Sequence, residues 1–379
     1  MRVLFVIPHP IEAASGRLRV LQYLPWLHAQ GIQCEVRPFM PPALYRLLYQ
    51  PGRLPQKISM SAAAVIRRCL DVGRVAKADV VVVHREAWPL GTALLERLMA
   101  RRSSAMVFDF DDAIYLPHAS RVNAWANVFK RPGKISQVIA ASTHVTAGNS
   151  VLAGYARRYN PKVSIIPTPV DTEAFHPRQA RVDSSRLVIG WMGSHTTASY
   201  LQEIRRPLEQ LLRAHPQVEL RVVGAGHLPY RLPNLQEIPW TLESEQHELH
   251  RFDIGLMPMP DDPWTQGKCG FKALLYMSVG IPVVASPVGV NSAIIQDGVS
   301  GFLANDEQTW FDRLAQLIDD EALRRRMGRA GRAMVEQEYS VKAQAPRLIR
   351  VLREAHDGPR GDGVPLSEPV HAGASHAAA

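Results

Sequence analysis

Lys268, Lys272 and Tyr276 follow one another at four-residue intervals, so on a helix they would share one face. The two lysines fall in or just before the expected first turn, where the helix dipole disfavours cations and like charges repel by about 0.2–0.5 kcal/mol. An anion held between both lysines and the free backbone amides of that turn would offset these penalties. The spacing predicts a site for the two phosphates of a nucleoside diphosphate, with Tyr276 against the ribose or base. The alternative is that both lysines extend freely into water.

A second group of small polar residues follows the apolar run IGWM. Gly193, Ser194 and Thr196 would lie where a strand ends and a helix begins, which is the edge where open α/β sheets bind ligands. Ser194 and Thr196 are candidate hydrogen-bond donors to a phosphate or sugar, although serine and threonine also cap helices there. Near the amino terminus, Gly16 would let the backbone approach a ligand, and Arg17 could hold an anion.

Acidic residues gather after two further apolar runs. Asp109, Asp111 and Asp112 lie at the end of AMVFDF, and acids this close repel one another unless they bind something. A divalent metal, sugar hydroxyls, or an acceptor hydroxyl deprotonated by one acid are the candidate partners; helix capping and ion pairing are the structural alternatives. Hydroxyls are favoured over a metal because no phosphate-binding loop adjoins the cluster. Glu86, after the run VVVV, is a further candidate acid or base.

These residues need a scaffold that brings strand ends together, and short β-rich apolar runs do alternate with longer helical patterns. A helix is expected at 17–30, a second from residue 193 to 214, and nearly continuous helix at 309–355, interrupted near Gly328, Gly331 and Pro346. The fold class is therefore α/β, with two successive rounds of the same alternation. Strands are predicted at 2–7, 33–37, 79–83, 105–110, 144–147 and 163–166, then at 187–191, 219–223, 254–258 and 281–285.

Length and composition narrow the class of protein. A chain of 379 residues, 46% hydrophobic and 21% charged, suits two globular α/β domains. Its three cysteines are far apart and form no CxxC pair, which argues against a disulfide framework or structural zinc and fits a reducing compartment. No apolar run reaches the ~20 residues of a membrane helix, and the amino-terminal run resembles a buried strand more than a secretory signal. A cytoplasmic location is expected.

The net charge of +9 indicates an anionic partner. Residues 46–77 carry much of the excess, and this stretch is either a solvated helix face or a contact with an anionic membrane, where each cation adds about 1 kcal/mol. Nucleic acid is not the expected partner, because the aromatic residues form no stacking platform and no recognised module occurs. The basic residues of the stretch, opposed only by Asp71, are Arg46, Arg53, Lys57, Arg67, Arg68, Arg74 and Lys77.

Four segments together carry a family resemblance: PVVASPVGVNSAIIQDGVSGFL, IGWMGS, VTAGNSVLA and IIPTPVD. In this order they resemble the retaining glycosyltransferases of the GT-B type known as glycosyltransferase family four, or "glycosyl transferases group 1". The resemblance implies two Rossmann-like domains facing each other across a cleft, an acceptor-side domain at 1–178 and a donor-binding domain at 179–340. A helix at 341–356 would return to the first domain, and composition predicts a disordered tail at 357–379.

The resemblance also implies an activity: transfer of a sugar from a nucleotide-diphosphate sugar to a saccharide or lipid-linked acceptor, with retention, no metal and no cofactor. Bacterial cell-surface polysaccharide synthesis is the expected setting. Lys268 and Tyr276 stand where the family usually carries paired glutamates, so Lys268 and Lys272 are expected to hold the diphosphate. The four acids, Glu86 included, would face acceptor or reacting sugar as catalytic residues. The alternatives are a nucleotide-sugar epimerase of similar build and a non-catalytic partner subunit.

Overall fold

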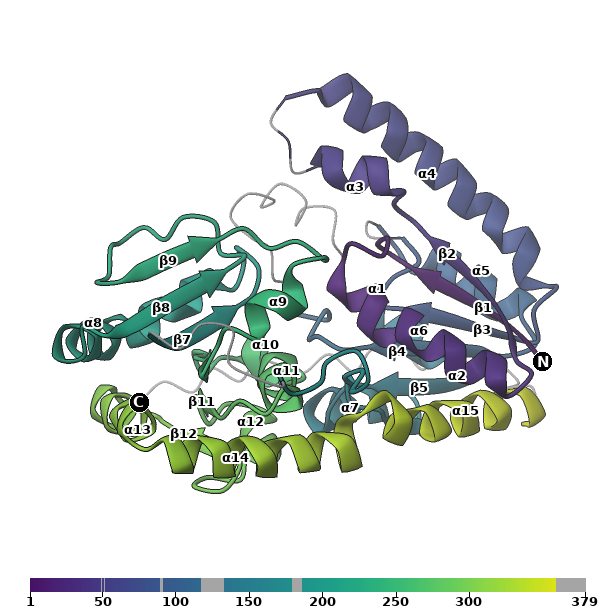
Figure 1. Cartoon of the computed structure of the whole chain (residues 1–379). Helices are drawn as coiled ribbons and strands as arrows, with labels where there is room; N and C mark the ends of the chain where they lie inside the picture. The colour runs from purple at the N-terminus through teal and green to yellow at the C-terminus, as the bar shows by residue number, and fades with distance from the viewer. Residues whose placement is uncertain (49, 51, 89–90, 117–132, 179–185, 359–379) are drawn as a thin grey trace, which may run out of the picture.

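The chain forms two lobes, each built around a six-stranded, wholly parallel sheet (Figure 1). The computed structural model describes all residues except 49, 51, 89–90, 117–132, 179–185 and 359–379. The boundary expected near residue 179 and nearly all of the expected tail therefore lie outside the described residues. No helix among those described is both long and apolar enough to span a bilayer.

The N-terminal lobe has the strand order β2-β1-β3-β4-β5-β6. Its strands are β1 (Arg2–Ile7), β2 (Gln33–Pro38), β3 (Val80–His84), β4 (Met106–Phe110), β5 (His144–Ala147) and β6 (Val163–Ile165). Its helices are α1 (Ala14–Arg19), η1 (Leu21–Tyr23), α2 (Leu24–Ala29), α3 (Pro42–Leu48), α4 (Leu54–Val75), α5 (Leu94–Arg102), α6 (Lys134–Ala141) and α7 (Ser150–Arg157).

The C-terminal lobe has the strand order β12-β11-β10-β7-β8-β9. Its strands are β7 (Leu187–Met192), β8 (Val218–Val223), β9 (Leu235–Ile238), β10 (Ile254–Met257), β11 (Val283–Ala285) and β12 (Gly301–Leu303). Its helices are η3 (Ala198–Ile204), α8 (Arg205–Ala214), α9 (Glu245–Leu249), α10 (Pro263–Gln266), α11 (Phe271–Ser278), α12 (Asn291–Ile294), α13 (Glu307–Asp319), α14 (Glu321–Met334) and η4 (Val335–Tyr339).

Every strand predicted from the sequence is present. The central strands are buried on both faces and read as continuous apolar runs, whereas the predicted edge strands β2 and β6 are only partly buried. β9 and β12 were not predicted. Both are edge strands of the second sheet, they are four and three residues long, and β9 is only partly buried. An edge strand pairs on one side only, so it needs no continuous apolar run.

All three helical expectations need correction. The helix expected at 193–214 begins only at residue 198 and consists of η3 followed by α8. The helix predicted at 17–30 is broken into α1, η1 and α2, and Pro25 lies in the first turn of α2, where proline favours a new start. In the last part of the chain the breaks fall at Asp320, which caps α14, and at Ser340, which caps α15, and α14 runs unbroken through Gly328 and Gly331. Gly328 serves close packing, since a Cβ there would lie 1.9 Å from the carbonyl oxygen of Gly280.

The last helix, α15 (Val341–Asp357), lies against the N-terminal lobe and continues through Pro346. Its buried face includes Ala345, Leu348 and Leu352, which belong to the same hydrophobic cluster as side chains of β1 and β3. In Figure 1 the chain passes from α14 beneath the second sheet to α15 beneath the first. The two lobes are therefore tied together by the end of the chain.

Candidate functional site

A turn from the C-terminal lobe packs against the strand ends of the N-terminal lobe. This turn, residues 267–269, joins α10 to α11 and is called the interlobe turn here. Asn149, the residue that caps α7, donates its side-chain amide to the carbonyl oxygens of Gly267 at 2.9 Å and Lys268 at 3.0 Å. The thiol of Cys269 donates to the carbonyl oxygen of Asp111 at 3.1 Å. Both lobes thus hold the segment that carries Lys268.

The ammonium group of Lys268 faces the N-terminal lobe. Its Nζ lies 3.5 Å from Oδ1 of Asp112 and 5.4 Å from the ring centre of Trp264, and its side chain is 19% exposed. Burial opposes the charge on Lys268, but the carboxylate of Asp112 outweighs that effect and raises the pKa of the lysine. Lys268 is therefore a charged group at the junction of the lobes, and it does not extend freely into water.

Lys272, one turn further on, lies beside the loop that follows β7. Its Nζ is 3.4 Å from Oγ1 of Thr197 and 5.5 Å from the ring centre of Trp191. Burial and the positive charge of Lys268 lower the pKa of Lys272 to about 7, against the smaller opposite effect of Asp112. Gly193 leaves room for this side chain, since a Cβ there would lie 2.7 Å from Cε of Lys272. An additional anion here would be stabilised by both lysines.

The loop after β7 presents two exposed hydroxyl groups. Ser194 Oγ and Thr196 Oγ1 lie 2.7 Å apart, and the carbonyl oxygen of Ser194 accepts hydrogen bonds from the next turn of the chain. Thr197 joins this loop to Lys272, so the structure brings the predicted loop and one predicted lysine together. These hydroxyls are accessible to a phosphate or sugar bound at the lysines.

The expected contact of Tyr276 with a nucleoside needs correction. The side chain is fully buried, and its hydroxyl accepts a hydrogen bond at 2.9 Å from the backbone amide of Met192 at the end of β7. Its ring fills the space over Gly255, where a Cβ would lie 2.4 Å from a ring carbon. Because α11 enters the core after its first turn, residue 276 packs against the sheet and presents no polar atom to a ligand.

Asp109 also differs from expectation, because it lies beneath the surface. Its carboxylate forms an ion pair with the buried Arg19, accepts a hydrogen bond from the Thr146 hydroxyl at 2.6 Å and lies 2.7 Å from Nδ1 of His84. Burial alone would raise the pKa of Asp109, but Arg19 and His84 lower it well below its ordinary value. Nε2 of His84 in turn lies 2.5 Å from the partly exposed Ser15 hydroxyl. Asp109 is thus fully used in a structural network.

Asp111 and Asp112 are held by Arg85. The Arg85 guanidinium donates to Asp111 at 2.7 Å and to Asp112 at 2.5 Å, and Arg85 has a left-handed backbone with φ 59°. A non-glycine residue keeps that conformation only where its surroundings hold it, as these two ion pairs do. Burial would raise the pKa of Asp111, but the positive charge of Arg85 outweighs it and the pKa is lowered. Asp112 also faces Lys268 and so connects the loop after β4 to the C-terminal lobe.

Glu86 pairs with a lysine of the N-terminal lobe. Its carboxylate lies 3.5 Å from Nζ of Lys134 in α6, which also pairs with the buried Glu96 at 2.9 Å. Of the four predicted acids, Asp111 and Asp112 therefore lie at the junction, Asp109 lies beneath it, and Glu86 belongs to a neighbouring ion-pair group.

Gly16 and Arg17 have partners that the sequence did not indicate. Gly16 is buried, and a Cβ there would lie 3.2 Å from Cδ1 of Ile7, so this glycine lets α1 pack on β1. Arg17 forms an ion pair at 2.8 Å with Glu245 of α9 in the other lobe and lies 5.9 Å from the ring centre of Trp240. The charge predicted to hold a phosphate is thus balanced by a carboxylate across the junction.

Sequence reasoning missed several residues of this site: Asn149, Thr197, Trp191, Trp240 and Glu245. Asn149 lies within VTAGNSVLA, one of the segments that carried the resemblance, so its position was available although its contacts were not. Glu245 lies in a polar stretch without a motif, and its partner is 228 residues away in the chain. No local pattern could have found that pair.

The acids of the junction have cationic side-chain partners in Arg19, Arg85 and Lys268. Among the residues that the structure describes, no group of three or more His, Cys, Asp or Glu could hold a metal ion.

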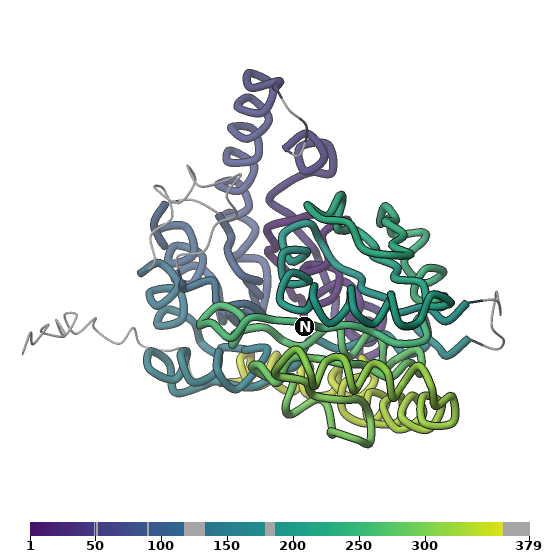
Figure 2. The backbone as a smooth tube through the Cα atoms, turned by 90° about the vertical axis from the view of Figure 1, so that its left-hand side faces the viewer, coloured from purple at the N-terminus to yellow at the C-terminus, as the bar shows by residue number. Residues whose placement is uncertain are grey.

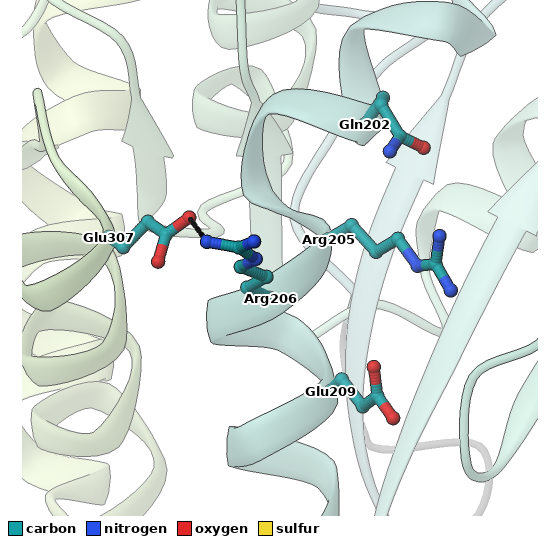
Figure 3. A pocket seen from close by; sticks show the side chains of 5 residues that line it. All are labelled: Gln202, Arg205, Arg206, Glu209 and Glu307. Atoms are coloured by element: carbon teal, nitrogen blue, oxygen red, sulfur yellow. Dashed lines mark ion pairs between the residues drawn. The ribbon is translucent and has the colours of Figure 1, made fainter.

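A separate polar hollow lies on the far side of the C-terminal lobe, where α8 meets the start of α13 (Figures 1 and 3). It is remote from the junction, and it is lined by Gln202, Arg205, Arg206, Glu209 and Glu307.

Comparisons with known proteins agree with this architecture. Residues 186–320 match the family model described as "Glycosyl transferases group 1". The D-inositol 3-phosphate glycosyltransferase of Corynebacterium jeikeium (strain K411) is 27% identical over 236 residues, which cover 54% of this chain and 54% of that protein. The chain thus spans about half the length of the curated relatives that it matches.

Two solved structures share the arrangement of the whole chain. Sucrose-phosphate synthase from Thermosynechococcus elongatus superposes with a TM-score of 0.67 at 15% identity, covering 93% of this chain and 98% of that one. Anabaena HepE in complex with UDP and glucose superposes with a TM-score of 0.64 at 15% identity, covering 93% and 99%. The predicted fold class, two Rossmann-like domains of the GT-B type, is confirmed.

Proposed function

We propose that this protein is a glycosyltransferase that moves a sugar from a nucleotide-diphosphate sugar to a saccharide or lipid-linked acceptor. The observation that carries the proposal is the position of Lys268 and Lys272. Lys268 lies in the interlobe turn and Lys272 in the first turn of α11, and both are poised for an additional anion. The match of residues 186–320 and the likeness to HepE with bound UDP support a nucleoside diphosphate as that anion.

The reaction follows from this arrangement. The bond between C1 of the donor sugar and the diphosphate oxygen breaks, and the acceptor oxygen bonds to C1. Charge develops on the departing diphosphate, and Lys268, Lys272 and the amides at the start of α11 neutralise it. The acceptor proton leaves to a diphosphate oxygen or to Asp112, the partly exposed acid beside Lys268. Asp111 and Asp112, fixed by Arg85, orient the hydroxyls of the reacting sugar.

Retention of anomeric configuration belongs to the proposal and requires the acceptor to enter on the face that the diphosphate leaves. Independence from metal ions also belongs to it, and the arginine and lysine partners of the acids support it. The three free cysteines support a cytoplasmic location, with bacterial cell-surface polysaccharide synthesis as the setting.

Binding of UDP-, GDP-, ADP- and CMP-linked sugars, measured by thermal shift and calorimetry, tests the proposal. A diphosphate sugar should raise Tm, because a ligand of the folded state stabilises it. Each charge-assisted hydrogen bond contributes about 1.5–3 kcal/mol, so Lys268→Ala combined with Lys272→Ala should weaken binding at least a hundredfold. Lys342→Ala, at an exposed position in α15, is the matched control and should bind like the wild type.

The chemistry is tested by turnover with and without acceptor. A transferase consumes donor in proportion to the acceptor glycoside formed, and NMR of that product gives its anomeric configuration. An epimerase would convert the donor alone, and a non-catalytic subunit would do neither. Unchanged nucleotide affinity in the double variant, or no nucleotide binding by the wild type, contradicts the proposal. Activity that chelators abolish contradicts only the metal-independent part.

A further inference from the structure

The outward face of α4 carries an apolar ridge. Leu54, Ile58, Ile66 and Leu70 are among the most exposed large hydrophobic side chains of the described residues, with exposed fractions of 65%, 60%, 62% and 69%. With the exposed Ala62 they occupy every fourth position along about 24 Å of helix, and because four residues exceed one turn by about 40°, the row winds about 160° around the axis from Leu54 to Leu70. Scattered apolar side chains are ordinary on a surface, but a continuous row of them marks a contact face.

Ile66 and Leu70 lie opposite the stripe of α4 that packs on the lobe and Ile58 lies beside it, whereas Leu54 is in line with the buried Val72. The side chains of α4 that lie against the protein include the buried Ala64, Val72 and Val75. A surface helix normally carries polar residues opposite its buried stripe, whereas α4 carries aliphatic ones. Figures 1 and 2 show α4 at the outer edge of the N-terminal lobe, with its first half projecting beyond the sheet. The ridge is therefore accessible to a large, flat partner.

Basic residues flank the ridge, although fewer than the sequence suggested. Arg68 is buried with Asp71, and Arg67 donates to the backbone carbonyl oxygens of Pro38 and Phe39, so these two arginines serve the fold. Asp71 is the single acid in residues 39–77, and it is itself buried. The basic residues that remain exposed are Arg46, Arg53, Lys77 and Arg74, the last of which pairs with Glu35 at 3.5 Å.

We infer that α4 docks the protein on an anionic lipid bilayer, with Ile58, Ile66 and Leu70 inserted below the headgroups and the exposed basic residues on the lipid phosphates. Interfacial helices combine these two features: an apolar face enters the acyl boundary, and cations bind anionic headgroups. A second copy of the chain fits less well, because a two-fold contact through this face would bring the like-charged flanks together.

The docking surface is separate from the lysines of the junction and does not depend on the proposed transferase activity. If the protein both docks on the membrane and transfers a sugar, a lipid-linked acceptor, which is confined to the membrane, is favoured over a free saccharide. This consequence rests on the proposed function. Vesicle binding and nucleotide binding are measured separately, so failure of one leaves the other standing.

Flotation of the full-length protein tests the inference, using vesicles of phosphatidylcholine alone or mixed with equal phosphatidylglycerol. The wild type should float with the anionic vesicles. The fraction bound to neutral vesicles should be at least tenfold lower, since each cation strengthens binding roughly fivefold. Ile58→Ser, Ile66→Ser and Leu70→Ser together should abolish flotation without lowering Tm, because these side chains make little contact in the folded protein. Arg46→Glu, Arg53→Glu and Lys77→Glu together should remove the preference for anionic lipid.

The matched control replaces exposed hydrophobic residues elsewhere, Leu94→Ser, Ile165→Ser and Val299→Ser, whose exposed fractions are 73%, 36% and 44%. This control should float like the wild type. The inference is overturned if the wild type stays at the bottom with anionic vesicles, or if the ridge variant floats as well as the control. It is also overturned if sedimentation shows a dimer that the ridge variant alone dissociates, because the face then belongs to a second copy.

Discussion

Asn149 in the N-terminal lobe donates its side-chain amide to the carbonyl oxygen of Lys268 in the C-terminal lobe, at 3.0 Å. The same side chain caps α7, since its oxygen accepts a hydrogen bond from the backbone amide of Leu152 at 2.9 Å. One residue therefore fixes both the start of a helix in one lobe and the position of a candidate phosphate ligand in the other. The interlobe turn is placed by a contact between lobes rather than by its own sequence.

Replacing Asn149 separates these two roles. Asn149→Ser keeps a good helix cap but lacks the amide that reaches the interlobe turn, so unfolding free energy should fall by about 1 kcal/mol or less while donor affinity falls several-fold. Asn149→Ala loses the cap as well and should cost about 1–2 kcal/mol more in stability. Urea unfolding and calorimetry of donor binding measure both effects. If the serine variant binds donor like the wild type, the turn does not depend on Asn149.

Donor affinity should decline from pH 6 to pH 9 because of Lys272. Its pKa is about 7 in the free protein, and a bound diphosphate would raise it. The complex then binds more protons than the free protein between these two pKa values, so affinity falls as pH rises, at most about tenfold per pH unit. Calorimetry in two buffers of different ionisation enthalpy would detect the proton uptake.

Lys272→Arg is the matched variant for this pH dependence. Arginine stays charged over the whole range, so the variant should show no decline in affinity and no proton uptake. A wild-type affinity that is flat between pH 6 and pH 9 would mean that Lys272 does not contact the diphosphate.

The pair formed by Arg17 and Glu245 decides whether Arg17 can serve as a phosphate ligand. Glu245 holds the guanidinium at 2.8 Å, and both side chains are at most 15% exposed. If phosphate competes with this carboxylate, Glu245→Gln should raise nucleotide affinity about fivefold, roughly 1 kcal/mol, and the gain should vanish when Arg17→Met is added. Unchanged or weaker binding in Glu245→Gln would assign the pair to joining the lobes alone.

Asp109, near the end of β4, should serve the fold, whereas Asp112, in the loop that follows, should serve the reaction. Asp109→Asn leaves Arg19 buried without its counter-charge and should lower unfolding free energy by about 3–5 kcal/mol. Asp112→Asn alters a partly exposed acid and should change stability by under about 1 kcal/mol while lowering turnover. Thermal unfolding and steady-state kinetics distinguish the two, and equal stability losses would contradict the division.

The lowered pKa of Asp109 also predicts how the stability of the protein changes at acidic pH. It is lower in the folded protein than in the unfolded chain, so the unfolded chain binds more protons in the acid range. The stabilisation is complete above the unfolded pKa of about 3.9 and is lost as pH falls further. Asp109→Asn should therefore make the acid side of the stability profile shallower than in the wild type.

The sequence by itself determined the α/β class, the ten predicted strands and the helix start that carries Lys268 and Lys272. These features are local, because strand burial, helix periodicity and glycine positions are written in neighbouring residues. The short edge strands β9 and β12, four and three residues long, were missed because so few residues form no apolar run long enough to recognise.

Only the tertiary structure decided which predicted groups lie at the junction. Lys268 meets Asp112 across 156 positions of sequence, and Arg17 meets Glu245 across 228. Tyr276 shares a helix face with Lys272, yet one turn takes it from the junction into the core. Such pairings depend on how the two lobes dock. The periodicity of a sequence indicates which face of a helix is apolar, but it does not identify the element that packs against that face.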